Sequence, residues 1–491
     1  MRKSGVLMHI SSLPSRWGIG SLGDEAIKFV DFLAAAGQSF WQVLPVSPTG
    51  FGDSPYQAFS SIAGNPYFID LDLLCRDGLL EKPEYAGLDW GSDPERVDYG
   101  RMSQNRPQVL RRAAGRLLRA DDGEFRGFCA ENSAWLDSYA LFMAIKDSRG
   151  GRSWENWEEP LRLSRRGALD GVRASLQNAV DFHRAVQFFF FRQWDRLKRY
   201  ANGRGVSIIG DLPIYAAADS ADVWENPRLF RLDDSLRPVD VAGCPPDGFC
   251  PGGQLWGNPL YRWEEHRKDG FSWWADRIKR QFALFDLLRI DHFRGFAGYY
   301  AIPAGARTAQ SGHWEKGPGM TLFSAVGRAL GAMPIIAEDL GFLDDSVRSL
   351  LEESGFPGMR VMQFAFSPEE DSRYLPHNYV QNCVAYTGTH DNTTARGWFE
   401  SAPQAELSKA LDYLRIRGDE RPERAMLRAL WGSAAGLVIA PVQDLLGLGP
   451  EARMNTPGTL GGNWQWRLRP NSGLAERAGR LRSLTALHGR L

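Results

Sequence analysis

Short apolar runs alternate with helical patterns along this chain, and each run stops at a turn or a charged group. The first run spans residues 5–10, a helix is predicted from about 24 to 36, and a second run spans residues 40–45. Buried strands of a parallel sheet read as nearly continuous apolar runs. The succession of strand, helix and strand therefore predicts a parallel sheet.

Runs of this kind recur along the whole chain, with helical segments between them. They lie near residues 6, 42, 208, 289, 336, 362, 385 and 439. Eight strands separated by helices are what a (β/α)8 barrel requires, whereas open doubly wound sheets more often stop at about five or six. We therefore predict an α/β fold, a TIM barrel with large insertions between strands on its C-terminal face. A last helical pattern, through Leu474, Leu481 and Leu484, would close the ring.

Two segments depart from this rhythm. Residues 65–200 read as mainly helical, and residues 214–270 are rich in Gly, Pro and aromatic residues with little periodicity. Long irregular loops in compact domains are usually functional. We expect one elaborated catalytic domain over residues 1–491, with a helical insertion subdomain at 65–200 and a loop-rich insertion at 214–270 over the mouth of the barrel.

Composition narrows the range of partners. The chain carries 58 Lys and Arg against 59 Asp and Glu, a net charge of -1, which argues against nucleic acid as a partner. Its five cysteines are odd in number and form no C-x-x-C pair, so neither a disulfide framework nor a zinc site is indicated. No signal peptide or membrane span is recognisable, which predicts a cytoplasmic protein without membrane association.

Acidic residues end four of the predicted strands. They are Asp211, Asp291, Glu338 and Asp391. The C-terminal ends of barrel strands open on one face, so these side chains should converge there. One acid at a strand end is commonly half of a structural ion pair, but four of them indicate an active site.

Converging carboxylates suit metal binding, and His292 and His390 next to two of the acids keep that option open. Against it, the first strand offers only His9 and no His-x-His pair. Adjacent residues on a strand also point to opposite faces, so Asp291 and His292 would not easily face one metal. A metal-dependent barrel hydrolase is therefore an alternative, and we predict no metal and no cofactor.

The other chemistry is glycoside transfer, in which one carboxylate attacks the anomeric carbon and a second, kept protonated, delivers a proton to the leaving oxygen. Crowding among acids favours this, because like charges raise the pKa of one member. Aromatic loops around the mouth suit sugars, and Trp224, Trp256 and Trp464 lie in polar or Gly-rich loops.

At these residues the sequence resembles the alpha-amylase clan, and specifically the amylomaltase family of 4-alpha-glucanotransferases. The resemblance runs nearly end to end, and its motifs lie at residues 7–14, 53–56, 211–213, 289–295, 337–341 and 389–392, with 245–259 separating amylomaltases from amylases. It implies a retaining double displacement that moves segments from a donor malto-oligosaccharide to the 4-hydroxyl of glucose or another α-1,4-glucan.

The resemblance also implies a role for each site residue. Asp291 would be the nucleophile, Glu338 the acid/base and Asp391 the acid that stabilises the transition state, while Arg289 would hold the nucleophile ionised. The implied substrate-binding residues are Ser54, Tyr56, Asp211, Gln254, Trp256, Asn258, Arg289, His292, Asp339, His390 and Asn463.

The sequence departs from the family pattern in one loop. Relatives carry an aromatic residue where this chain has Gly248, and Cys244 and Cys250 also differ. An amylase-like α-1,4-glucan hydrolase is the alternative reading of the same acids. A non-catalytic glycan-binding protein is a further one, but it would be expected to lack one of the three acids, and all three are present.

Overall fold

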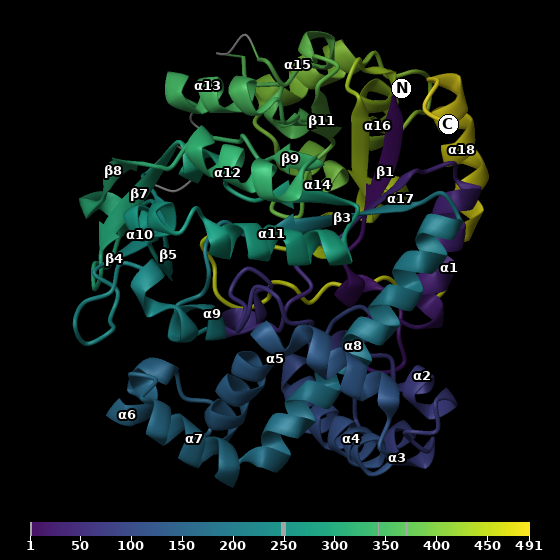
Figure 1. The fold of residues 1–491 in the computed structure, drawn as a ribbon. Helices are drawn as coiled ribbons and strands as arrows, with labels where there is room; N and C mark the ends of the chain where they lie inside the picture. The colour runs from purple at the N-terminus through teal and green to yellow at the C-terminus, as the bar shows by residue number, and fades with distance from the viewer. Residues whose placement is uncertain (1, 247–251, 342, 369–371) are drawn as a thin grey trace.

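Eight parallel strands close into a barrel in the computed structural model, which describes residues 2–246, 252–341, 343–368 and 372–491 (Figure 1). The strands run in the order β1-β12-β11-β10-β9-β6-β3-β2. This confirms the predicted fold class, and each of the eight predicted runs contains or adjoins one strand. The strands are β1 (Lys3–Leu7), β2 (Phe40–Gln42), β3 (Ser207–Leu212), β6 (Leu287–Ile290), β9 (Ile335–Ala337), β10 (Gly358–Val361), β11 (Cys383–Tyr386) and β12 (Leu437–Pro441).

The barrel strands are short and almost wholly buried, because helices cover their outer side and side chains fill the interior. The helix predicted over 24–36 is α1 (Asp24–Ala35), and the predicted closing helix is α18 (Ala478–Leu487), which packs against α1. The helices outside the long insertion are α1 (Asp24–Ala35), α9 (Ala221–Glu225), α10 (Trp263–Lys268), α11 (Ser272–Leu284), α12 (Met320–Leu330), α13 (Asp345–Ser354), α14 (Ala395–Ser401), α15 (Gln404–Leu414), α16 (Pro422–Gly432), α17 (Val442–Leu446) and α18 (Ala478–Leu487).

A helical layer lies below the barrel in Figure 1 and comes from the connection between β2 and β3. Its longest helices, α5 (Gly123–Ser148) and α8 (Gln177–Gly203), pack against each other. Trp224 is buried beside Phe142 and Trp157 and donates to the Leu161 carbonyl, so it belongs to this core and offers no exposed ring to a sugar. The layer contains α2 (Leu71–Arg76), α3 (Pro83–Ala86), α4 (Tyr99–Arg119), α5 (Gly123–Ser148), α6 (Glu159–Arg162), α7 (Arg166–Ser175) and α8 (Gln177–Gly203).

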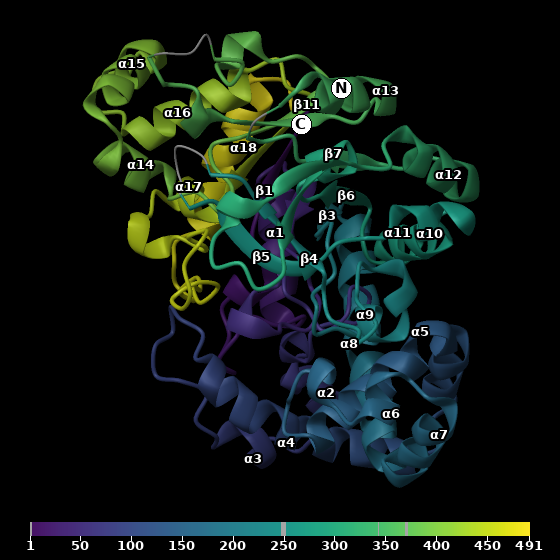
Figure 2. The same ribbon diagram turned by 90° about the vertical axis from the view of Figure 1, so that its left-hand side faces the viewer.

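A second sheet lies beside the barrel, on the left in Figure 1 and towards the viewer in Figure 2. It is antiparallel, in the order β5-β4-β7-β8. The sequence pattern did not reveal it, because β5 contains a glycine and a proline and β8 is mostly polar. Its strands are β4 (Asp240–Cys244), β5 (Gln254–Pro259), β7 (Gly298–Pro303) and β8 (His313–Lys316), and the first two lie in the segment read as loops.

The cysteines and the hydrophobicity of the helices bear on disulfide formation and on membrane association. Cys75, Cys129 and Cys383 are free thiols. Within the described ranges, no helix combines the length and the apolar character needed to cross a membrane.

Candidate active site

The three proposed catalytic acids come from the C-terminal ends of barrel strands. Asp291 directly follows β6, Glu338 directly follows β9, and Asp391 lies in the loop after β11. Asp211 lies within β3, opposite Arg289 of the neighbouring β6. The acids therefore gather at the face where barrel enzymes carry their active sites.

Arg289 links two of these acids. Its Nη1 lies 2.7 Å from Asp211 Oδ2, and its Nη2 lies 3.1 Å from Asp291 Oδ1. Arg289 and Asp211 are buried, so neither charge is compensated by water. Burial alone would lower the pKa of Arg289, but the two carboxylates outweigh it and raise that pKa well above its usual value. Arg289 is therefore a fixed positive charge beneath Asp291.

Asp291 experiences opposing influences. Its pKa is raised to about 7, because desolvation in the cleft and the charges of Asp211 and Asp391 together outweigh the lowering effect of Arg289. Because the guanidinium touches Asp291 directly, the ionised form of this carboxyl is the one that the contact stabilises.

Glu338 lies in a different setting. Its Oε2 accepts from the His292 backbone N–H at 2.7 Å, and its Oε1 accepts from that of Leu340 at 3.2 Å. The pKa of Glu338 is raised to about 8, because desolvation and the charge of Asp291 together outweigh the lowering effects of Arg289 and of the His292 N–H. Glu338 therefore keeps its proton at neutral pH.

The turn after β6 aims that backbone donor. His292 has φ 51°, the left-handed conformation that costs a residue with a side chain roughly 1 kcal/mol. This geometry brings the His292 N–H to Glu338 and leaves the imidazole edge-on to Trp256, with ring centroids 4.8 Å apart. Burial lowers the pKa of His292 to about 3, so its ring is neutral.

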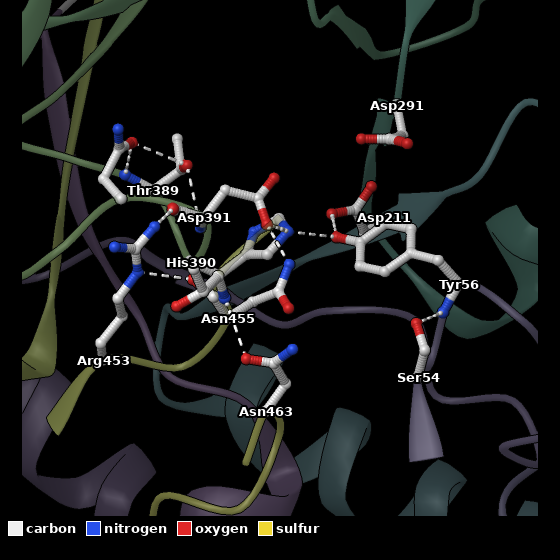
Figure 3. A network of polar contacts seen from close by, with 12 residues as sticks. Ser54, Tyr56, Asp211, Asp291, Thr389, His390, Asp391, Arg453, Asn455 and Asn463 are labelled. Atoms are coloured by element: carbon white, nitrogen blue, oxygen red, sulfur yellow. Dashed lines mark hydrogen bonds and ion pairs between the residues drawn. The ribbon is translucent and has the colours of Figure 1, made fainter. Parts of the chain in front are cut away.

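A polar chain connects Asp211 to Asp391 across the site (Figure 3). The Tyr56 hydroxyl donates to Asp211 Oδ2 at 2.9 Å and lies 3.0 Å from His390 Nε2. His390 Nε2 in turn lies 3.3 Å from Asp391 Oδ1. The Tyr56 and His390 rings stack with centroids 5.3 Å apart.

Two residues that the sequence reading did not single out hold Asp391. Asn455 Nδ2 donates to Asp391 Oδ1 at 2.6 Å, and Arg453 Nη2 donates to the Asp391 carbonyl at 2.6 Å. Both lie after α17 and the 3-10 turn Pro450–Ala452, in an irregular segment beyond the last barrel strand (Figure 3). Because no strand ends at these residues, the strand-end pattern could not find them.

The insertion contributes its own side chains through β5. Gln254 and Trp256 lie two residues apart and so share one face, and Asn258 follows after an irregularity of the strand at Gly257, which has φ 80°. Trp256 is half-buried and its Nε1 donates to Gln254 Oε1 at 3.1 Å. Gln57 joins the strand to the loop after β2 by donating to the Trp256 carbonyl and to Asn258 Oδ1.

Two of the predicted substrate-binding residues, Asp339 and Asn258, are buried and bonded to other parts of the protein. Asp339 is buried and accepts from the Met359 N–H and from Arg360. Asn258 is buried and donates to the Ala216 carbonyl.

Two others hold backbone near the cleft (Figure 3). Asn463 accepts from the Thr456 N–H and donates to Thr459, so it closes its own loop. Ser54 Oγ accepts from the Tyr56 N–H and so shapes the turn that carries the tyrosine.

The departures from the family pattern fall at the end of β4. Cys244 is its last residue and is partly buried, while Gly248 and Cys250 lie outside the described residues. In the described ranges no three His, Cys, Asp or Glu side chains are grouped so that they could hold a metal ion.

One carboxyl paired with a cation and a second one kept protonated form an arrangement suited to retaining glycoside chemistry. Comparison of the sequence with known protein families agrees with this geometry. The family model described as 4-alpha-glucanotransferase matches residues 8–472.

Relatives resemble the chain over nearly its full length. A 4-alpha-glucanotransferase of Clostridium butyricum is 46% identical over 98% of this chain and 100% of its own, and one of Thermus thermophilus is 46% identical over 100% and 99%. Amylomaltase from Streptococcus agalactiae, solved with acarbose, superposes with a TM-score of 0.97 at 43% identity and full coverage of both chains. The chain therefore belongs to the 4-alpha-glucanotransferase family and is an enzyme that transfers segments of α-1,4-glucans.

Proposed function

We propose that the transfer is a double displacement in which Asp291 is the nucleophile, Glu338 the acid/base and Asp391 the acid that stabilises the transition state. The observation that carries the assignment is the difference between the surroundings of Asp291 and those of Glu338. Arg289 touches Asp291, whereas Glu338 is held by backbone N–H groups and has a pKa raised to about 8. One carboxyl is thus prepared to attack and the other to give a proton.

In the first half-reaction an Asp291 oxygen bonds to the anomeric carbon of the donor while the bond from that carbon to the glycosidic oxygen breaks. Glu338 transfers its proton to the departing oxygen, so the leaving glucan departs neutral and Glu338 becomes a carboxylate. Asp391 faces the positive charge that develops on the sugar ring, and Asn455 and Arg453 hold it in place.

In the second half-reaction the Glu338 carboxylate takes the proton of an acceptor 4-hydroxyl. That oxygen attacks the anomeric carbon, the ester to Asp291 breaks, and Glu338 is protonated again. Two inversions retain the α configuration. We propose malto-oligosaccharides and longer α-1,4-glucans as donors, and glucose or another glucan as acceptor.

Transfer also demands that a sugar reach the glycosyl-enzyme before water does, which is a matter of access and orientation. We assign this task to the β5 face of the insertion. Trp256 presents a half-buried ring beside His292, one residue from the nucleophile, and Gln254 is bound to that ring. The indole gives the acceptor an apolar platform, and the neutral ring of His292 beside it can bond the acceptor's hydroxyls. His390, beside Asp391, can bond hydroxyls of the sugar that is being transferred.

Steady-state kinetics with donor and acceptor varied independently test the two-step scheme. A glycosyl-enzyme that forms before the acceptor binds gives parallel double-reciprocal lines. Intersecting lines at every pair of concentrations would contradict the scheme, because they require donor and acceptor to be bound together before the bond breaks.

A further inference from the structure

Among the Phe, Trp and Tyr side chains whose exposure the structure describes, Trp314 is the most exposed. It lies on β8, the outer strand of the four-stranded sheet, and is 43% exposed. Large aromatic side chains are mostly buried in soluble proteins, and the other tryptophans in the described ranges are more buried than this one.

The contacts of Trp314 show which part of the indole is open. The guanidinium carbon of Arg294 lies 3.9 Å from the ring centroid, so Arg294 covers one face. Tyr300 of β7 meets the ring edge-on, with centroids 5.2 Å apart. Arg294 is itself buried and bound to Asp344 at 3.3 Å. Arg294 and Tyr300 therefore fix the ring, and its exposed area belongs to the face opposite Arg294 and to the free edge.

Arg294 also connects Trp314 to the active site. It lies three residues after Asp291, in the 3-10 turn Phe293–Phe296. With about 3.8 Å between successive Cα atoms and one arginine side chain to span, the centre of the indole ring lies within about 22 Å of the Asp291 Cα. His292, between the two, touches Trp256. Trp256 and Trp314 lie on β5 and β8, the two outer strands of one four-stranded sheet, and each touches a residue of the turn that follows the nucleophile.

We propose that Trp314 is an outer binding platform for the acceptor glucan, contacting glucose units several positions away from the reacting 4-hydroxyl. The proposal rests on the function proposed above, in which the acceptor enters past Trp256. The C–H faces of a pyranose ring complement the negative face of an indole. Lys316 shares the sheet face of Trp314 because it lies two residues further along β8, and the partly exposed Asp344 is paired with the arginine that covers Trp314, so both can bond sugar hydroxyls.

Acceptors of increasing length test this directly. Elongation of glucose, maltose, maltotriose and maltohexaose, each labelled at the reducing end, would be measured at a fixed donor concentration. Trp314→Ala should leave kcat/KM for glucose unchanged and lower it about three- to tenfold for maltohexaose, chiefly through KM, because only the long acceptor reaches the ring. Trp314→Phe should recover part of the loss, and Val380→Ala, at an exposed apolar residue, should behave as wild type.

Three results would overturn the proposal. Equal kcat/KM values for Trp314→Ala and wild type at every length would show that the ring binds no glucan. An equal loss at every length, glucose included, would show that Trp314 supports the site only through Arg294. Loss of a dimer on gel filtration, with unchanged kinetics, would show that the β8 edge pairs with a second copy of the chain.

A binding measurement separates this proposal from the catalytic one. Calorimetry with maltoheptaose and a Glu338→Gln background, with and without Trp314→Ala, should show weaker binding in the double variant. If Glu338→Gln turns over the ligand, the catalytic assignment fails, while the length dependence in the wild-type background still decides the role of Trp314.

Discussion

The barrel and the four-stranded sheet beside it support the active site in different ways. The barrel delivers its acids from strand ends that are buried on both sides, and it fixes Asp211 and Asp291 through the buried Arg289. The antiparallel sheet leaves side chains open to solvent, among them Leu255 and Trp314. The difference suggests that the barrel carries out the bond chemistry for every substrate, whereas the sheet decides which hydroxyl completes the reaction.

The largest expected effect belongs to the barrel acids. Asp291→Asn and Glu338→Gln should each lower kcat by several orders of magnitude, because a nucleophile or a general acid acts only in the transition state. Transfer from maltotriose measures the loss, and thermal melting should show that both variants stay folded. Asp345→Asn, at an exposed residue paired with Arg348, is the matched control. A variant of either acid that keeps a tenth of wild-type turnover refutes its assignment.

Arg289 comes next. Arg289→Lys keeps a charge but loses the planar fork that reaches Asp211 and Asp291 together, so we expect kcat to fall about a hundredfold. Arg289→Met should also lower the free energy of unfolding by about 3–5 kcal/mol, because the buried Asp211 loses its cation. Denaturant titration measures this, with Arg348→Lys on the surface as control. Unchanged stability of the Met variant would show that Asp211 does not depend on Arg289.

The raised pKa values of the pair predict a pH profile. Glu338 holds its proton up to about pH 8, and above that value the general acid is lost. Asp291 gains a proton below about pH 7 and then can no longer attack. The kcat/KM profile should therefore be bell-shaped, with its maximum between these values.

A donor with a good leaving group sharpens this test. α-Maltosyl fluoride needs no proton to release fluoride, so the alkaline limb should weaken or vanish when formation of the glycosyl-enzyme is measured with it. If the limb stays at the same pH with the fluoride, a group other than Glu338 controls it.

The sheet should give smaller and more selective effects. Trp256→Ala should lower transfer more than hydrolysis, raising the ratio of new reducing ends to glucose released from maltotriose, because water gains access when the acceptor platform is lost. Leu255→Ala is the control, since the neighbouring side chain on β5 points to the other face. An equal fall in both activities would mean that Trp256 supports the barrel chemistry instead.

Much of the barrel could be predicted because its strands are apolar runs that end in acids, a pattern that a single sequence displays. The four-stranded sheet could not, because β8 reads His-Trp-Glu-Lys and β5 contains Gly257 and Pro259, so neither resembles a buried strand.

Within the active site, too, some residues could be predicted from the sequence and others could not. The acids at strand ends could be found, but Asn455 and Arg453 lie in an irregular loop and reach Asp391 only through the closed fold. Position at a strand end can also predict the wrong role. Asp339 follows Glu338 directly, but its side chain is buried and bonds Met359 and Arg360.

Trapping the glycosyl-enzyme tests the central assignment most directly. Glu338→Gln should react with α-maltosyl fluoride, because fluoride leaves without a proton, and should then persist as an ester, because no base activates the acceptor. Mass spectrometry of the digested protein should find one maltosyl group on the peptide that contains Asp291, and none in Asp291→Asn/Glu338→Gln. A maltosyl group on Asp391 or Asp211 would contradict the account.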